Sequence, residues 1–387
     1  MTPKSCPPLG GFAFACAAAA LLTSGSAEAA ENYRLRQPSF PLLGADMGAT
    51  AIERVGFFGT AAISSINTYE ITGDNSDPIQ SPGQTIPLPT GSVTGGALPD
   101  GSYNAVVQPG RIDFDQTSQQ FNLILGYLFD PGIEGARIGV SVNQIYQHSS
   151  REVVLGPQAI SLQPAPSPAL PPPLTAVLNG ALANVATQVE LRRAAELRMH
   201  NQDAKGFGDT TVALLYTQTG MQGRLRAAGA VSYTFANGDF QIDRGPNPGF
   251  NYDTTRIEGV LAYTFPDDRP MLAGVTLGAR TAYGWNGRNE ATDYRTGDFF
   301  NLELAAQKTR GDFAFGMNIF ALVQTTHDEG VSLPLDAPRY EAYGAGPFIA
   351  YRFPGRNIGL NLSYADTFGV RNGQAGRGVS LRFIRTW

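Results

Sequence analysis

The chain has 387 residues, enough for one large domain or two ordinary ones, so its size excludes only a peptide or a small disulfide-stapled module. Its 28 Lys and Arg against 33 Asp and Glu give a net charge of −5 without a dense basic block, which argues against nucleic acid as a partner. Charged residues are 16%, below the roughly 25% of soluble domains, while Gly (45) and Pro (27) are abundant. The mean hydropathy of −0.14 and the absence of an apolar run of about 18 residues exclude a helical membrane protein. A strand-and-turn protein remains.

Residues 1–29 have the three parts of a secretory signal. A lysine precedes an apolar stretch at 9–22, and small residues at 27–29 form a cleavage site. We expect cleavage after Ala29, with a short buried helix as the alternative. Both cysteines would leave with this segment, so the mature chain would be exported without disulfides. Residues 30–53 would then form a periplasmic or luminal segment ahead of the folded domain.

Alternating apolar and polar stretches recur from about residue 54 to the end and predict twelve strands. Each can supply the roughly 9 to 11 residues with which a tilted strand crosses a bilayer. The even count places both ends of the strand array on the periplasmic side. The expected strands are 54–71, 118–129, 137–148, 206–218, 224–235, 254–265, 271–286, 298–308, 313–326, 340–353, 357–370 and 377–387.

The connectors between these strands come in two sizes, which alternate along the chain. The short ones are rich in Gly, Pro and Asp, as tight turns require. They lie at 130–136, 220–223, 266–270, 310–312 and 354–356, and the long ones at 73–117, 151–205, 237–253, 287–297, 328–339 and 371–376. Short turns at one end and long loops at the other are typical of an outer-membrane barrel.

The two faces of the strands differ in chemistry. In the stretch 357–364, Ile358, Leu360, Leu362 and Tyr364 alternate with small and polar residues. A soluble sandwich also alternates, but here Tyr-x-Phe triplets end several strands. Aromatic residues at strand ends form the belt of a membrane interface. The sequence therefore predicts an all-β, transmembrane, antiparallel up-and-down barrel in the bacterial outer membrane.

Two of the long loops carry features of their own. The first, 73–117, is rich in Gly, Pro, Ser and Thr and is expected to be an exposed excursion. The second, 151–205, has a proline-rich part followed by a helical pattern at 174–199 with one apolar stripe. Such an extracellular helix could cover its stripe on the barrel mouth or enter the lumen as a constriction. A partly disordered loop that orders on contact is the alternative.

Catalytic patterns are sparse. The chain has no phosphate loop, no nucleophile elbow and no zinc-binding helix motif, and its three histidines are far apart, so we expect neither a cofactor nor a metal site. His148 and Ser150 would lie on one face of a strand, where the imidazole could activate the hydroxyl, as in outer-membrane lipid hydrolases. A solvated loop rim explains the same residues.

Charged and amide side chains fall on the expected inner face. They could line or gate a pore. They could equally satisfy one another in a packed interior, because a twelve-stranded barrel is narrow. The candidates for lining the lumen are Arg226, Arg256, Glu258, Arg280, Glu303, Asn318 and Arg382.

The chain ends on an aromatic residue within its last strand. Val379, Leu381, Phe383 and Trp387 share the apolar face of 377–387. This ending resembles the signal that the barrel-assembly machinery reads, so Phe383 and Trp387 are expected to carry it. Assembly machinery and outer-membrane lipid are therefore expected partners.

The segment Ser39–Thr60, with its SFPLLGADMGAT opening, resembles the phenol meta-pathway outer-membrane family (SphA-like proteins). Gly206–Thr211 resembles the Gly-x-Gly-Asp strand opening common there. The resemblance implies an outer-membrane barrel assigned to transport and linked to degradation of aromatic or other hydrophobic compounds, with no catalytic residues to carry over. We therefore expect passive uptake of a small hydrophobic solute. A lipid hydrolase and a closed, adhesive barrel are the alternatives, and the oligomeric state stays open.

Overall fold

The computed structural model describes residues 54–387 except 243, 269 and 331–338. The expected signal and residues 30–53 lie outside the described residues. Two compact units make up the described part. Ile79–Asp113 and Val153–Met199 form what we call the small unit, and the remaining described residues form the barrel unit. Each is described by itself.

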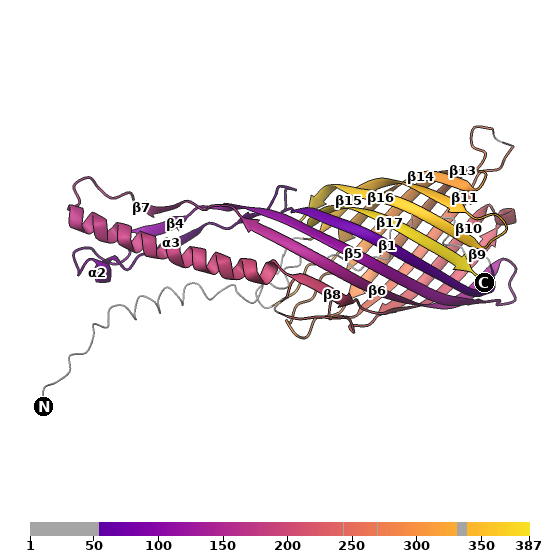
Figure 1. The fold of residues 1–387 in the computed structure, drawn as a ribbon, viewed down its shortest axis with the longest axis horizontal. Helices are drawn as coiled ribbons and strands as arrows, with labels where there is room; N and C mark the ends of the chain where they lie inside the picture. Colours follow the sequence, from indigo (N-terminus) through magenta and orange to yellow (C-terminus); the bar gives the residue numbers. More distant parts are fainter. Residues whose placement is uncertain (1–53, 243, 269, 331–338) are drawn as a thin grey trace, which may run out of the picture. The chain divides into compact units, whose positions relative to one another are not determined.

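The barrel unit is a closed antiparallel barrel. Each strand pairs with its neighbour in sequence order, and β1 pairs with both β5 and β17, which closes the sheet (Figure 1). Of the fourteen strands in this sheet, β2 (Gln80–Ser81) and β8 (Asp203–Phe207) are short additions, which leaves the twelve that were predicted. These are β1 (Gly56–Ile71), β5 (Gly110–Phe129), β6 (Ala136–Leu155), β9 (Thr211–Gly220), β10 (Leu225–Thr234), β11 (Thr254–Thr264), β12 (Val275–Asn286), β13 (Phe299–Arg310), β14 (Phe313–Gln324), β15 (Glu341–Arg352), β16 (Ile358–Arg371) and β17 (Gln374–Thr386).

The predicted loop 371–376 is wrong. Only two residues separate β16 from β17, and Asn372 takes a φ of 55°, which asparagine tolerates in tight turns. Of the two glycines that suggested a loop, Gly373 lies in the turn and Gly376 lies within β17. At Gly376 a Cβ would lie 2.7 Å from the carbonyl oxygen of Asn67, so the close approach of β1 requires glycine there. The expected strand at 206–218 is divided into β8 and β9, and β5 and β6 are longer than predicted.

The outer face of the barrel is apolar. Large exposed side chains project from alternate positions of every strand, as the outward face of β17 illustrates with Val379, Leu381 and Phe383. The Tyr-x-Phe triplets form ring contacts near strand ends, with centroids 4.7 Å apart for Tyr127 and Phe129. Others are Tyr233 with Phe235, Tyr263 with Phe265 and Tyr351 with Phe353. The predicted apolar outer face and the aromatic residues near strand ends are confirmed.

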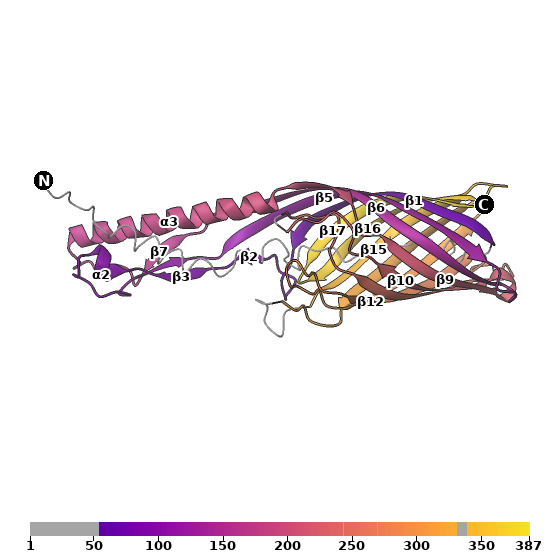
Figure 2. The same cartoon turned by 90° about the horizontal axis from the view of Figure 1, so that it is seen from below.

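The small unit is a three-stranded sheet with a long helix. Its strands are β3 (Gln84–Pro87), β4 (Asn104–Val107) and β7 (Ile160–Gln163), and its helices are α2 (Thr90–Val93) and α3 (Pro172–His200) (Figure 2). The predicted helix is thus confirmed. None of the helices among the described residues is both long and apolar enough to cross a membrane.

The apolar stripe of α3 is covered by residues of the first long loop. Leu178 and Val185 are buried in one cluster with Leu88, Ala105 and Leu162. This differs from both expected arrangements, the barrel mouth and the lumen. The reason is a long-range strand pairing between β4 and β7, which the periodicity of one segment does not reveal.

Candidate functional site

The predicted lumen residues lie on inward positions of the barrel wall. Arg280 of β12 donates a hydrogen bond from Nη2 to Oε1 of Glu258 on β11, at 2.7 Å. Arg256, two residues before Glu258 on the same face, places its Nε 3.8 Å from Oε2. All three side chains are at most 16% exposed. A carboxylate thus lies between two guanidinium groups, which is the arrangement that lets charges stay ionised away from water.

A second carboxylate continues this arrangement on the next strand. Glu303 of β13 lies directly opposite Arg280 in the register and is almost fully buried. Asn318 of β14 donates a hydrogen bond from Nδ2 to Glu303 Oε1, at 3.0 Å. Arg382 of β17 also interacts electrostatically with Glu303, although three strands separate β13 from β17. This interaction crosses the interior of the barrel.

Together with Arg226, which occupies an inward position of β10 and is half-buried, these residues form what we call the lumen charge cluster. The structure brings six of its seven members into one connected group. The cluster contains four arginines and two glutamates, so its own charge is positive. In a narrow interior a net positive charge attracts anions and repels cations. Whether these residues handle a solute stays a prediction.

Aromatic rings also face the interior, and sequence reasoning missed them. The ring of Phe320 on β14 covers Gly344 of β15, and the ring of Phe348 on β15 covers Gly316 of β14. A Cβ at either glycine would meet the ring within van der Waals distance. Phe58 over Gly126 and Phe299 over Gly284 repeat the arrangement. The interior therefore combines charged groups with flat apolar surfaces. The sequence signal for these rings is a glycine that pairs with an inward phenylalanine on the neighbouring strand. It can be recognised only once the register of the strands is known.

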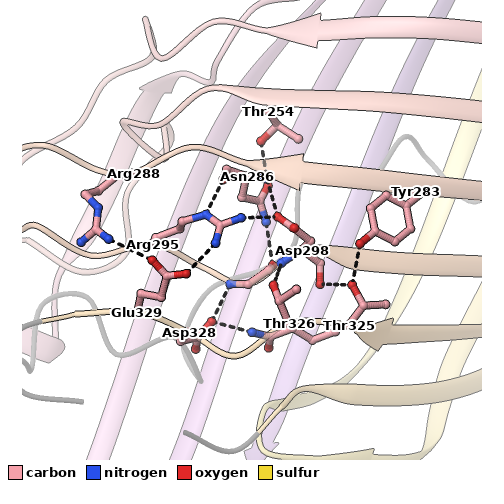
Figure 3. A network of polar contacts seen from close by, with 12 residues as sticks. Thr254, Tyr283, Asn286, Arg288, Arg295, Asp298, Thr325, Thr326, Asp328 and Glu329 are labelled. Carbon is pink, nitrogen blue, oxygen red and sulfur yellow. Dashed lines mark hydrogen bonds and ion pairs between the residues drawn. The ribbon is translucent and has the colours of Figure 1, made fainter. Parts of the chain in front are cut away.

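A second polar network joins two loops at the ends of β12, β13 and β14 (Figure 3). Arg295 donates hydrogen bonds from Nη2 to Asp298 at 2.8 Å and from Nη1 to Glu329 at 2.7 Å. Arg288 donates to the other oxygen of Glu329 at 3.0 Å. The backbone N–H of Gly297 donates to Asp328 at 2.7 Å. The two loops are thereby tied to each other, and sequence reasoning missed this contact because its partners are far apart in the chain.

The pair His148 and Ser150 lies on the outer face of β6. Both side chains are exposed and pair with Lys205 and Asp203 of β8 in the register. Ser149 points the opposite way and is buried. The proposed hydrolytic role stays a prediction. Among the residues that the structure describes, no group of three or more His, Cys, Asp or Glu is placed to hold a metal ion.

The two residues of the expected assembly signal are exposed at the end of the chain. Phe383 projects outward from β17, and the N–H of Trp387 donates a hydrogen bond to the carbonyl of Phe57 at 2.9 Å. The guanidinium of Arg385 lies 5.0 Å from the centre of the Trp387 ring. The last residues therefore complete the β1–β17 seam. Recognition by assembly machinery stays a prediction.

The chain resembles known proteins in sequence and in fold. The family described as "Putative MetA-pathway of phenol degradation" matches residues 174–383, more than half of the chain. An outer-membrane channel from Pseudomonas putida F1 superposes with a TM-score of 0.61 at 11% identity, covering 88% of this chain and 99% of that one.

Two other solved structures are more distant. The β domain of the Bordetella autotransporter BrkA has a TM-score of 0.43 at 9% identity, with 86% and 100% of the two chains covered. The CymD monoaromatic hydrocarbon channel has a TM-score of 0.35 at 10% identity, with 90% and 94% covered. No curated protein matches the sequence.

Proposed function

From the fact that the chain belongs to this phenol-degradation family, we propose that it is an outer-membrane channel for passive uptake of small hydrophobic solutes, aromatic ones included. The observation that carries the proposal is the closed barrel whose interior holds both the lumen charge cluster and aromatic rings. The fold shared with an outer-membrane channel supports it at the level of architecture. A barrel of twelve strands leaves room for small molecules only.

The chemistry of the interior suggests how such a solute would pass. Of the inward rings, Phe320 is half-buried and offers a flat surface on which an aromatic solute can stack, whereas Phe348 is only 5% exposed. The charged groups beside them are held by one another, for example Glu258 between its two arginines. A solute moving along the rings would therefore not have to break their ion pairs. Solutes would diffuse down their gradient without energy input.

The small unit is our candidate for control of access. Its helix α3 and three strands form a folded element inserted between barrel strands rather than an unstructured loop. A folded insertion can move as a unit between defined positions. Gating by residues 151–205 is part of the proposal.

Liposome swelling with the refolded protein tests the proposed function. We expect faster swelling with phenol-like and short alkyl solutes than with small sugars of similar size. Liposomes without protein give the background rate. Swelling with sugars alone would indicate a general porin, and no swelling with any solute would indicate a closed barrel; either result would overturn the proposal.

A further inference from the structure

Arg151 is a buried cation above the lipid-facing part of the barrel wall. The outward positions of β6 are apolar from Ile138 to Val142 and at Tyr146, with Gln144 between them, and polar from His148 to Glu152. The membrane-facing stretch therefore ends near Tyr146. Arg151 lies beyond that point on the inward side of the strand, and its side chain is only 6% exposed. It is outside the lumen charge cluster.

The contacts of Arg151 leave much of its guanidinium unused. Its Nε donates a hydrogen bond to Oε1 of Gln116, at 2.7 Å, and its guanidinium carbon lies 5.6 Å from the centre of the Phe114 ring. Neither contact supplies a negative charge, and no carboxylate among the described residues pairs with it. Burial lowers its pKa to about 10, so it remains charged at neutral pH. Its two Nη groups make no hydrogen bond within the described chain.

His200 adds a second unsatisfied group beside this arginine. Its Nδ1 is buried and has no hydrogen-bond partner among the described residues. Burial and the neighbouring charge of Arg151 lower the pKa of the imidazole to about 4, so the ring is neutral at physiological pH. A neutral imidazole can donate one hydrogen bond to an oxygen atom. Gln116 and the buried hydroxyl pair of Ser118 and Ser149, 2.8 Å apart, complete a polar wall.

A buried charge without a counter-ion is costly, and an anion that supplies the missing partner removes that cost. We propose that Arg151, His200 and the Phe114 ring form a binding site for the carboxylate of a small aromatic or apolar acid. This proposal rests on the proposed function, because the solute has to enter through the channel. It adds that the substrate class is anionic.

Two observations favour a carboxylate over phosphate. One guanidinium and one neutral imidazole balance a single negative charge, whereas the charge of inorganic phosphate at neutral pH lies between one and two. The ring of Phe114 is 6% exposed and lies beside the guanidinium, so that side of the cation is apolar, which suits the hydrocarbon part of an organic acid. The positive lumen charge cluster lower in the barrel would also favour an anionic solute over a cationic one.

Calorimetric titration of the purified full-length protein in detergent tests the site. Benzoate is the probe, benzamide is its neutral counterpart of nearly the same shape, and inorganic phosphate is the competing anion. We expect benzoate to bind at least about tenfold more tightly than benzamide or phosphate, because benzamide lacks the charge that pairs with the arginine and phosphate lacks the hydrocarbon part that packs beside Phe114. Arg151→Gln should weaken benzoate binding about tenfold or more and leave benzamide unchanged.

Controls separate this site from general charge effects. Arg111→Gln removes an exposed arginine from the outer face of β5 and should not alter benzoate binding. If Arg151→Gln fails to fold, Arg151→Lys keeps the charge but loses the planar fork and should weaken binding several-fold. Equal binding of benzoate and benzamide, tighter binding of phosphate, or unchanged binding in the Arg151 variants would each overturn the proposal.

The outcome is independent of the test of the channel. Liposome swelling by benzyl alcohol without benzoate binding would leave the channel standing and remove the acid site. Benzoate binding without swelling by any solute would establish the site and remove the channel.

Discussion

Arg280 reaches diagonally across the sheet to Glu258, since Val260 is the residue directly opposite it in the β11–β12 register. On its other side, Glu303 of β13 lies directly opposite. One arginine therefore lies between two carboxylates on neighbouring strands. Strands β11, β12 and β13 are held together inside the barrel by charge as well as by backbone hydrogen bonds.

Replacing Glu258 should destabilise the barrel, because Glu258→Gln leaves Arg256 and Arg280 without their shared counter-ion. We expect a loss of about 3 kcal/mol, at the low end of what breaking a buried ion pair costs. Urea unfolding in detergent micelles measures it. Glu152→Gln, at an exposed outward position, is the matched control and should change stability by less than about 0.5 kcal/mol.

Gly344→Ala should displace the ring of Phe320. The new Cβ would overlap that ring and lie 2.5 Å from the carbonyl oxygen of Asp366, so we expect a loss of about 1 to 3 kcal/mol. Gly259→Ala is the control, because its Cβ would meet only the methyl group of Thr281 at 3.8 Å. Equal stability of the two variants by heat-modifiable gel migration would contradict the ring packing.

The loop network should lose its order when Asp298 is replaced. In Asp298→Ala the side chain of Arg295 and the N–H of Asn286 lose an acceptor, so the segment 287–298 should be cut faster by protease. The barrel itself should keep its heat-modifiable migration. Asp293→Ala removes an exposed carboxylate from the same loop and serves as the comparison. The same cleavage rate in both variants would argue against the network.

Leu178 should be required for the small unit. Its side chain is fully buried under the β3–β4–β7 sheet, so Leu178→Ala should cost about 2 to 5 kcal/mol locally and increase hydrogen exchange in α3. Val177, its exposed neighbour on the helix, is the control. Val177→Ala should leave the exchange rates of α3 unchanged. A similar rise in both variants would contradict the packing of Leu178 against the β3–β4–β7 sheet.

Deleting residues 164–199 tests the gate. We expect the barrel to fold and its solute uptake in liposomes to change, because the deletion removes α3 but none of the twelve barrel strands. Unchanged uptake with an intact barrel would count against gating by this segment.

Much of the fold could be predicted from the sequence, because side chains on a strand alternate between its two faces. That alternation gave every barrel strand, its lipid-facing side, and the aromatic triplets at strand ends. It failed at 371–376, where Gly376, which the close approach of β1 requires, was interpreted as part of a loop. It also failed for α3, whose stripe was recognised but whose covering sheet was not.

The sequence by itself determined the number of strands, the face on which Arg256, Glu258 and Arg280 lie, and the presence of a helix in the second long loop. Only the tertiary structure decided which side chains meet: Arg280 with Glu258, Phe320 with Gly344, and Arg151 with Gln116. The physical reason is that a period of two residues specifies the side of a strand but not its register, and contacts between strands depend on register.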